Sequence, residues 1–289
     1  MDFLQPATWA EALAMKAAHP EALPIAGGTD VMVEINFDRH RPVAFIDLTR
    51  VAELAQWDQD GGQLRIGAGV TYTRIIAELG DRLPGLAMAS RTVGSPQIRN
   101  RGTVGGNLGS ASPAGDAHPP LLASRAIVEL ASVAGTRRVP AHEFFIGPKH
   151  NAMRKDELIA AFLIEAATGP QQFSKVGTRN AMVIAVCSFA LAIHPEQRRI
   201  GTGIGSAAPT PVTASAAEEF LAGVLDERGL WDKPKPLEES ALNRFGELVA
   251  SAAKPIDDIR GTAGYRRHAL AVMARRSFVW AWNAYAAAA

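Results

Sequence analysis

The hydrophobic and polar positions of the chain change period several times and predict a series of short strands and helices. Thr8-Trp9-Ala10-Glu11 has the pattern of a capping box, which predicts a helix from Trp9 to about Ala18. Alternating residues at 64–70, after a Gly-Gly turn, predict a strand. Further elements are predicted as strands at 23–26, 43–48, 158–166 and 198–204, a hairpin of 127–132 with 136–139, and helices at 71–78, 85–92, 119–124, 214–225, 237–253 and 262–288.

The second half of the chain is less clearly patterned. Lys175–His194 is strongly apolar and is predicted to form a strand followed by a helix, or one long element. The composition shifts near residue 173, where we expect a domain boundary. One face of the last predicted helix is apolar and is expected to pack on the core; it carries Tyr265, Ala269, Val272, Met273, Val279 and Trp280.

The most unusual stretch is Ile98–Asp116, which holds five glycines, several hydroxyl side chains and no acidic residue before Asp116. Glycine lets backbone N–H groups approach a ligand closely, because no Cβ blocks the way. Successive N–H groups of this kind form a concavity that favours anions such as a diphosphate. The alternative interpretation is a long surface loop without a ligand.

A second glycine turn precedes it. Pro24–Val31 is a short apolar run, then Gly27-Gly28, then Thr29 or Asp30 as the N-cap of a short helix. Alone this could be a structural turn, but two such segments without a P-loop lysine suggest one dinucleotide held from two sides. Gly201–Gly205 resembles a nucleotide fingerprint only superficially, because a Pro-Thr-Pro turn follows it instead of a helix, and we interpret it as structural.

These motifs carry a family resemblance. Ile25–Asp30, Arg99–Leu108 and Ala111–Asp116 together closely resemble the FAD-binding subunit of molybdenum-containing hydroxylases. The best match is the medium subunit of the aerobic carbon monoxide dehydrogenase type, and the FAD domain of xanthine dehydrogenase is a more distant relative. The resemblance covers nearly the whole chain and includes Phe3–Pro6, Phe144–Pro148, Asp156–Ile159, Lys175–Gly177, Ala208–Val212 and Pro255–Gly261.

The resemblance implies an α+β fold in two domains. Residues 1–173 would form a PCMH-type FAD-binding domain of two α/β subdomains, at about 1–55 and 56–173. Residues 174–289 would form a C-terminal α+β flavoprotein domain. FAD would bind in an extended form between the N-terminal subdomains and the C-terminal domain.

The resemblance also implies a set of FAD-binding residues. By position, the diphosphate would be held by Ile25, Ala26, Gly27, Gly28, Thr29, Asp30, Val31, Thr103, Val104, Gly105, Gly106 and Asn107. Asp116 matches an aspartate that hydrogen-bonds the flavin, Ile159 an apolar residue near the adenine, and Lys175 a lysine near the ring. A cation there would stabilise the anionic reduced flavin by Coulomb attraction. Alternatively, Lys175 is a solvated surface lysine and Asp116 a turn cap.

The chain departs from the family pattern after this lysine. Arg179–Ile184 stands where relatives tend to have Arg-Arg-x-x-Asp-Ile, so one arginine and the aspartate are missing. A pyridine-nucleotide contact at this point is therefore in doubt, and the terminal electron acceptor stays open.

The function implied by the resemblance is electron transfer. The substrate would be oxidised at a molybdenum cofactor on a large partner subunit, and electrons would pass through two [2Fe–2S] clusters of a small partner subunit to the FAD of this chain and then to an external acceptor. The assembly would be a dimer of heterotrimers. Two alternatives stay open: a stand-alone FAD-dependent oxidase or dehydrogenase, and a non-catalytic flavin-binding protein. We expect no catalytic residue and no metal ligand on this chain.

Composition narrows the remaining possibilities. The 289 residues are 47% hydrophobic and 20% charged, as in a globular protein, and the net charge of +1 gives no electrostatic case for nucleic acid. Cys187 lies in an apolar run and is expected to be a buried hydrophobe. Because it is the one cysteine of the sequence, the chain cannot bind a four-cysteine iron–sulfur cluster. The seven histidines show no ligand spacing, and His118 is expected to be a loop histidine. Without a membrane span or signal peptide, a cytoplasmic location is the default expectation.

Overall fold

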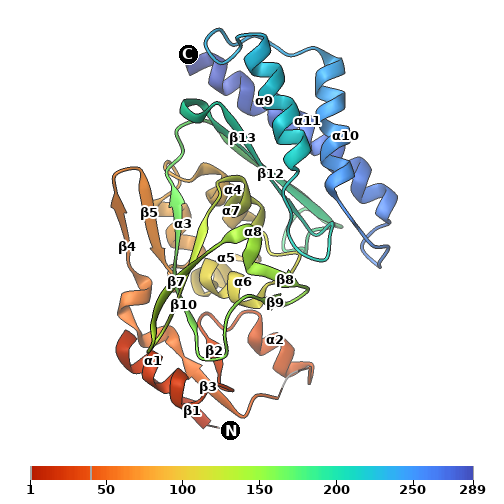
Figure 1. Ribbon diagram of the computed structural model, residues 1–289. Helices are drawn as coiled ribbons and strands as arrows, with labels where there is room; N and C mark the ends of the chain where they lie inside the picture. The colour runs from red at the N-terminus through yellow and green to blue at the C-terminus, as the bar shows by residue number, and fades with distance from the viewer. Residues whose placement is uncertain (1, 40, 289) are drawn as a thin grey trace.

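The computed structural model describes residues 2–39 and 41–288, so that Met1, His40 and Ala289 lie outside the described residues. The chain follows the predicted α+β order, and Figure 1 shows three sheet-containing layers between the N-terminus and the C-terminal helices. Within the described residues no helix combines the length and the apolar character needed to cross a membrane.

The N-terminal part is a small parallel sheet with the order β1-β3-β2. The predicted capping box is confirmed: Thr8 Oγ1 accepts a hydrogen bond from Glu11 N (3.2 Å), and Glu11 Oε2 accepts one from Ala7 N (2.8 Å). The elements are β1 (Asp2–Leu4), α1 (Trp9–Ala18), β2 (Leu23–Ile25), α2 (Val31–Asn36) and β3 (Ala44–Asp47).

A five-stranded antiparallel sheet with the order β4-β5-β10-β6-β7 forms the middle of the molecule. Its core is built around fully buried Leu64, Ile66 and Phe162. The strands are β4 (Trp57–Asp60), β5 (Gln63–Gly67), β6 (Ile127–Ser132), β7 (Gly135–Pro140) and β10 (Leu158–Glu165). The other elements here are α3 (Tyr72–Glu78), α4 (Pro84–Thr92), α5 (Pro96–Arg101), α6 (Val104–Ser110), α7 (His118–Ala123), α8 (Ala141–Phe144), β8 (Phe145–Gly147) and β9 (His150–Asn151).

The interpretation of Ile98–Asp116 as one long loop is wrong, because α5 ends and α6 lies within it. Thr103 begins α6, and its hydroxyl accepts a hydrogen bond from Gly106 N (2.9 Å). Glycine inside this helix has a packing reason: a Cβ on Gly105 would lie 2.4 Å from Ala68 O. Gly105 is therefore required by the close packing of this short helix on the end of β5.

The C-terminal part is an antiparallel sheet of β11 (Gln171–Val176), β12 (Cys187–His194) and β13 (Arg199–Gly205). The prediction of a helix or of one long element in Lys175–His194 is wrong, because two strands and a loop lie there. Residue 173, where a domain boundary was expected, lies inside β11, and the boundary stays a prediction. Helices α9 (Ser215–Glu227), α10 (Glu239–Ala252) and α11 (Ala263–Ala288) stack beside this sheet (Figure 1).

The predicted apolar face of α11 is partly wrong. Tyr265 and Trp280 are about half exposed, at 49% and 52%, whereas the polar residues Arg266 and Ser277 are buried. Ser277 Oγ lies 3.1 Å from Ser174 Oγ of β11. The buried face of α11 therefore includes polar residues that form hydrogen bonds, and it differs from the face that hydrophobicity alone predicts.

The glycines of β13 bring the middle and C-terminal parts together. A Cβ on Gly201 would lie 1.9 Å from Ala123 O, and one on Gly203 would lie 2.0 Å from Pro119 O, so α7 rests directly on the strand backbone. Thr202, on the opposite face, bonds Glu218 of α9. The structural interpretation of this glycine run is therefore confirmed.

This packing gives a testable prediction. Gly203→Ala should lower the free energy of unfolding by about 1–3 kcal/mol, because the added methyl group collides with backbone rather than with a movable side chain. Gly223→Ala in α9 is the matched control, since nothing lies within 4 Å of the added Cβ, and it should be neutral or stabilising by about 0.5–1 kcal/mol. Urea unfolding measures both, and equal effects would contradict the packing role.

Candidate functional site

The two glycine segments predicted from the sequence lie against each other. A Cβ on Gly27 would lie 2.0 Å from Arg101 O and 2.9 Å from Gly102 N, so the loop between β2 and α2 touches the link between α5 and α6. Gly28 has φ +74°, a conformation that favours glycine. Segments more than seventy residues apart in the sequence thus form one backbone surface.

This surface offers unused hydrogen-bond donors. Within residues 2–39 and 41–288, the backbone N–H groups of Gly28, Thr29, Asp30, Val104 and Gly105 have no acceptor. They come from both segments and lie next to the contact. Clustered backbone N–H groups of this kind suit an anion such as a diphosphate.

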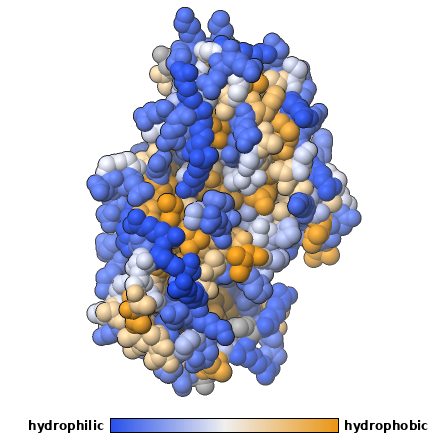
Figure 2. Space-filling view, in the orientation of Figure 1, coloured by the Kyte–Doolittle hydropathy of each residue, from blue (hydrophilic) through white to orange (hydrophobic). Residues whose placement is uncertain are grey.

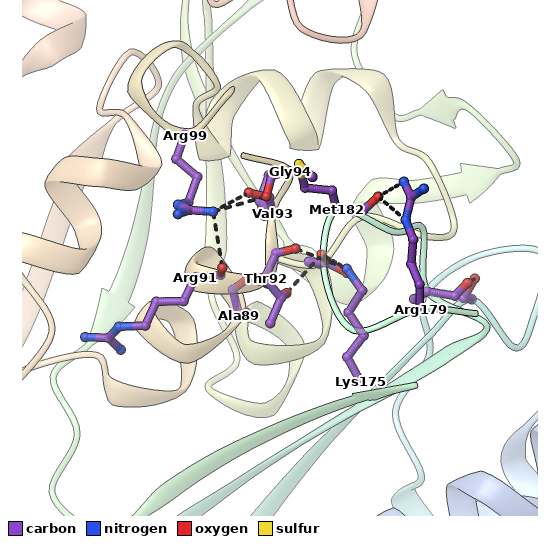
Figure 3. A network of polar contacts seen from close by, with 12 residues as sticks. Ala89, Arg91, Thr92, Val93, Gly94, Arg99, Lys175, Arg179 and Met182 are labelled. Carbon is purple, nitrogen blue, oxygen red and sulfur yellow. Dashed lines mark hydrogen bonds and ion pairs between the residues drawn. The ribbon is translucent and has the colours of Figure 1, made fainter. Parts of the chain in front are cut away.

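A buried ion pair joins the middle part to the C-terminal sheet. Lys175 Nζ of β11 lies 2.5 Å from Asp116 Oδ2, and the two side chains are only 8% and 7% exposed. Thr92, at the end of α4, donates through Oγ1 to the same carboxylate oxygen (3.0 Å), and its carbonyl accepts from Lys175 (3.3 Å). Figure 3 shows Lys175 reaching from its strand toward Thr92. The alternatives of a solvated Lys175 and a turn-capping Asp116 are therefore wrong.

The carboxylate of Asp116 can accept one more hydrogen bond. Burial raises the pKa of the Asp116 carboxyl above its usual value, and the Lys175 ammonium and the Thr92 hydroxyl oppose that rise. Asp116 Oδ1 is buried and has no partner among the described residues. An unpaired buried acceptor is costly, so this oxygen is suited to a donor brought by a ligand.

Two arginines order the backbone around the pair (Figure 3). Arg99 donates through Nη1 to the carbonyl oxygens that end α4, at Arg91 (3.3 Å), Val93 (3.1 Å) and Gly94 (3.1 Å). Arg179, in the segment that departs from the family pattern, folds back onto the carbonyls of residues 181 and 182. That segment therefore closes on itself beside Lys175.

His118 is the first residue of α7 and is fully buried, so the expectation of a loop histidine is wrong. Burial lowers its pKa to about 4, and the neutral ring donates from Nε2 to Asn107 O (3.1 Å). The ring also packs on Phe145, with centroids 4.5 Å apart. A Cβ on Gly115 would lie 2.3 Å from its Cε1. His118 thus shapes the segment between Asn107 and Asp116.

Ile159 and Tyr72 pack against the glycine-rich stretch 98–116. Ile159 of β10 is 7% exposed and lies under Gly109 of α6. Tyr72 was missed by the sequence interpretation; it packs on Gly102 and donates its backbone N–H to Gly102 O (3.0 Å). Burial raises the pKa of its hydroxyl well above the usual value. Thr92 was also missed, because a threonine within a predicted helix carries no signal of a polar site.

The described residues contain neither a cluster that could bind a metal ion nor a reactive thiol. No group of three or more His, Cys, Asp or Glu side chains there could hold a metal ion. Cys187 is fully buried, and burial raises the pKa of its thiol to about 12, which makes it inert.

Comparison with protein families identifies the class of protein to which this fold belongs. Residues 1–164 match the FAD binding domain in molybdopterin dehydrogenase, and residues 172–281 match the CO dehydrogenase flavoprotein C-terminal domain. The chain belongs to the FAD-binding medium subunits of molybdopterin hydroxylases, the carbon monoxide dehydrogenase and xanthine dehydrogenase family. It is therefore an oxidoreductase subunit.

Individual relatives cover between about three quarters and nearly all of the chain. The xanthine dehydrogenase FAD-binding subunit of Escherichia coli O157:H7 is 29% identical and covers 93% of this chain and 92% of its own length. The nicotinate dehydrogenase FAD-subunit of Eubacterium barkeri is 33% identical and covers 77% of this chain and 79% of its own length. A carbon monoxide dehydrogenase structure from Hydrogenophaga pseudoflava superimposes with a TM-score of 0.87 at 26% identity, covering 98% of this chain and 97% of the other.

The buried histidine predicts a pH dependence. The pKa of His118 is about 4 in the folded chain and about 6.5 when unfolded, so the unfolded chain binds more protons between these values. The contribution of His118 should therefore be complete above about pH 6.5 and fall by roughly 2 kcal/mol on acidification to about pH 5. His118→Gln should make the fall smaller without removing it, because burial also lowers the pKa of His194 to about 4, whereas exposed His142→Gln should leave the pH profile of urea unfolding unchanged. Parallel profiles for wild type and His118→Gln would contradict this.

Proposed function

We propose that this chain is the FAD-carrying electron-transfer subunit of a molybdenum hydroxylase complex. It would pass electrons from the [2Fe–2S] clusters of a partner subunit through FAD to an external acceptor. The observation that carries the proposal is the contact of two glycine segments that present unbonded backbone N–H groups, with a buried Lys175–Asp116 pair nearby.

The proposed cofactor-binding residues divide by role. The unbonded N–H groups on the two segments bind the diphosphate, Asp116 Oδ1 accepts a hydrogen bond from the flavin side, and Ile159 supplies apolar contact near the adenine. The full set is Ile25, Ala26, Gly27, Gly28, Thr29, Asp30, Val31, Thr103, Val104, Gly105, Gly106, Asn107, Asp116, Ile159 and Lys175. When bound, FAD supplies the redox chemistry, and the chain supplies position and electrostatics.

Lys175 sets the charge beside the ring. Its ammonium group favours added negative charge on a neighbouring ligand by Coulomb attraction, most strongly where water is excluded. Asp116 balances part of that charge at 2.5 Å, so the attraction is weaker than that of an unpaired lysine. The pair thereby sets an intermediate electrostatic environment for the flavin.

The proposal includes partner subunits. A chain with one cysteine cannot supply the four thiolates of an iron–sulfur cluster, so we assign the clusters to a small subunit and the molybdenum cofactor to a large one, as a dimer of heterotrimers in the cytoplasm. Exposed Ile146 and Ile256, at 66% and 68%, and the apolar surface over the middle of the molecule in Figure 2 support contacts with other chains. The substrate pocket then lies outside this chain.

Co-purification tests the proposal. The chain purified from its own host should carry FAD together with two partner chains, and one of carbon monoxide, an aldehyde, a purine or an N-heterocycle should bleach its flavin absorbance. The chain purified alone should bind FAD but stay oxidised with the same compounds. Bleaching of the isolated chain would favour a stand-alone oxidase, and an intact complex that no substrate bleaches would favour a non-catalytic flavin-binding protein.

The ion pair gives a second test. Lys175→Met should lower the free energy of unfolding by about 3–5 kcal/mol, because it leaves a buried carboxylate without its cation. Lys175→Met combined with Asp116→Asn should recover most of that loss. The midpoint potential of the bound flavin should be lower in Lys175→Met than in wild type, because a positive charge is removed. Urea unfolding and potentiometry measure the two effects, and an unchanged potential would contradict the role of Lys175.

A further inference from the structure

Arg266 lies in the first turn of α11 and is only 2% exposed. Its Nη1 donates to Val186 O (2.8 Å) and Ser206 O (2.5 Å), and its Nη2 donates to Asp258 Oδ1 (2.5 Å). A buried guanidinium is costly unless its hydrogen bonds are well made. Here the bonds go to two backbone segments, just before β12 and just after β13, whose strands are already paired with each other. The arginine therefore adds a further link that restrains one segment relative to the other.

The first segment leads to Lys175. Val186 closes the loop that follows β11, and its N–H donates to Val176 O (2.8 Å), next to Lys175 in the strand. By holding the carbonyl of Val186, Arg266 fixes the end of this loop. The loop includes Arg179 and Met182, which Figure 3 shows bonded to each other in the same view as Lys175.

The second segment leads to Asp116. Ser206 follows β13, and its N–H donates to Pro113 O (2.8 Å), three residues before Asp116. Its Oγ donates to Ala185 O (2.7 Å), the residue before Val186. Ser206 has φ +60°, a left-handed conformation that a non-glycine residue keeps only when its surroundings hold it. Arg266 supplies one of these restraints.

We propose that Arg266 is a positioning residue for the flavin site, acting through Val186 and Ser206 on the Lys175–Asp116 pair. This inference rests on the proposed function, since it takes FAD as the ligand of that site. The planar guanidinium reaches two carbonyls and a carboxylate at once, from two nitrogens in a fixed geometry. A lysine keeps the charge but offers one nitrogen and cannot reproduce that geometry.

The test uses the full chain with FAD as the titrated ligand. Arg266→Lys should raise the dissociation constant for FAD at least tenfold and alter the absorption bands of the bound flavin. Glu218→Gln is the matched control. Glu218 bonds Thr202 N and Oγ1, both at 2.7 Å, in the same domain but on the face of β13 opposite α7. It should lower the melting temperature and leave the FAD dissociation constant within twofold and the flavin spectrum unchanged.

Each outcome decides between the claims. Failure of wild type to bind FAD would overturn the proposed function itself. Wild-type affinity and spectrum in Arg266→Lys would overturn only the positioning role, and so would an equal loss of affinity in Glu218→Gln. Should Arg266→Lys not fold, Asp258→Asn weakens the same arginine through its partner; a two- to fivefold weaker FAD affinity supports the inference, and an unchanged affinity overturns it.

Discussion

Backbone meets backbone where the β2–α2 loop touches the link between α5 and α6, and the arrangement of the site depends on that contact. Only glycine permits it at residue 27, because any Cβ there would lie 2.0 Å from Arg101 O. In the described part of the chain, backbone N–H groups without an acceptor lie on both sides of this contact. A diphosphate can then be held by backbone donors without a lysine or an arginine.

The C-terminal part positions the segments of the site and adds one charged group, Lys175. Glycines in β13 let α7 rest on the strand, and α7 begins with His118, which bonds Asn107 of α6 within the glycine-rich segment. The same sheet carries Lys175 to Asp116. A single packed interface therefore sets both the shape of the backbone surface and the charge beside it, and a change in one is expected to reach the other.

Local patterns in the sequence predict what local physics decides. The capping box at Thr8, the hairpin of β6 and β7 and the two glycine segments are all where the patterns place them. The patterns fail where packing between distant segments decides. Glycines that normally weaken helices lie in α6 because of its contact with Ala68, and an apolar run that suits a helix forms β12 between two partner strands. Thr92 bonds Asp116 and Arg266 bonds Val186, and in each case the partner lies more than twenty positions away, where no local pattern can show it.

The central claim is that FAD binds where the two glycine segments, 24–31 and 98–116, touch each other. Gly27→Ala tests this claim most directly. Fluorescence titration should show FAD binding to wild type and at least a tenfold weaker affinity for Gly27→Ala, because the added methyl group forces the segments apart. Gly62→Ala, where nothing lies within 4 Å of the added Cβ, should bind like wild type. Equal FAD affinity for Gly27→Ala and wild type would contradict the account.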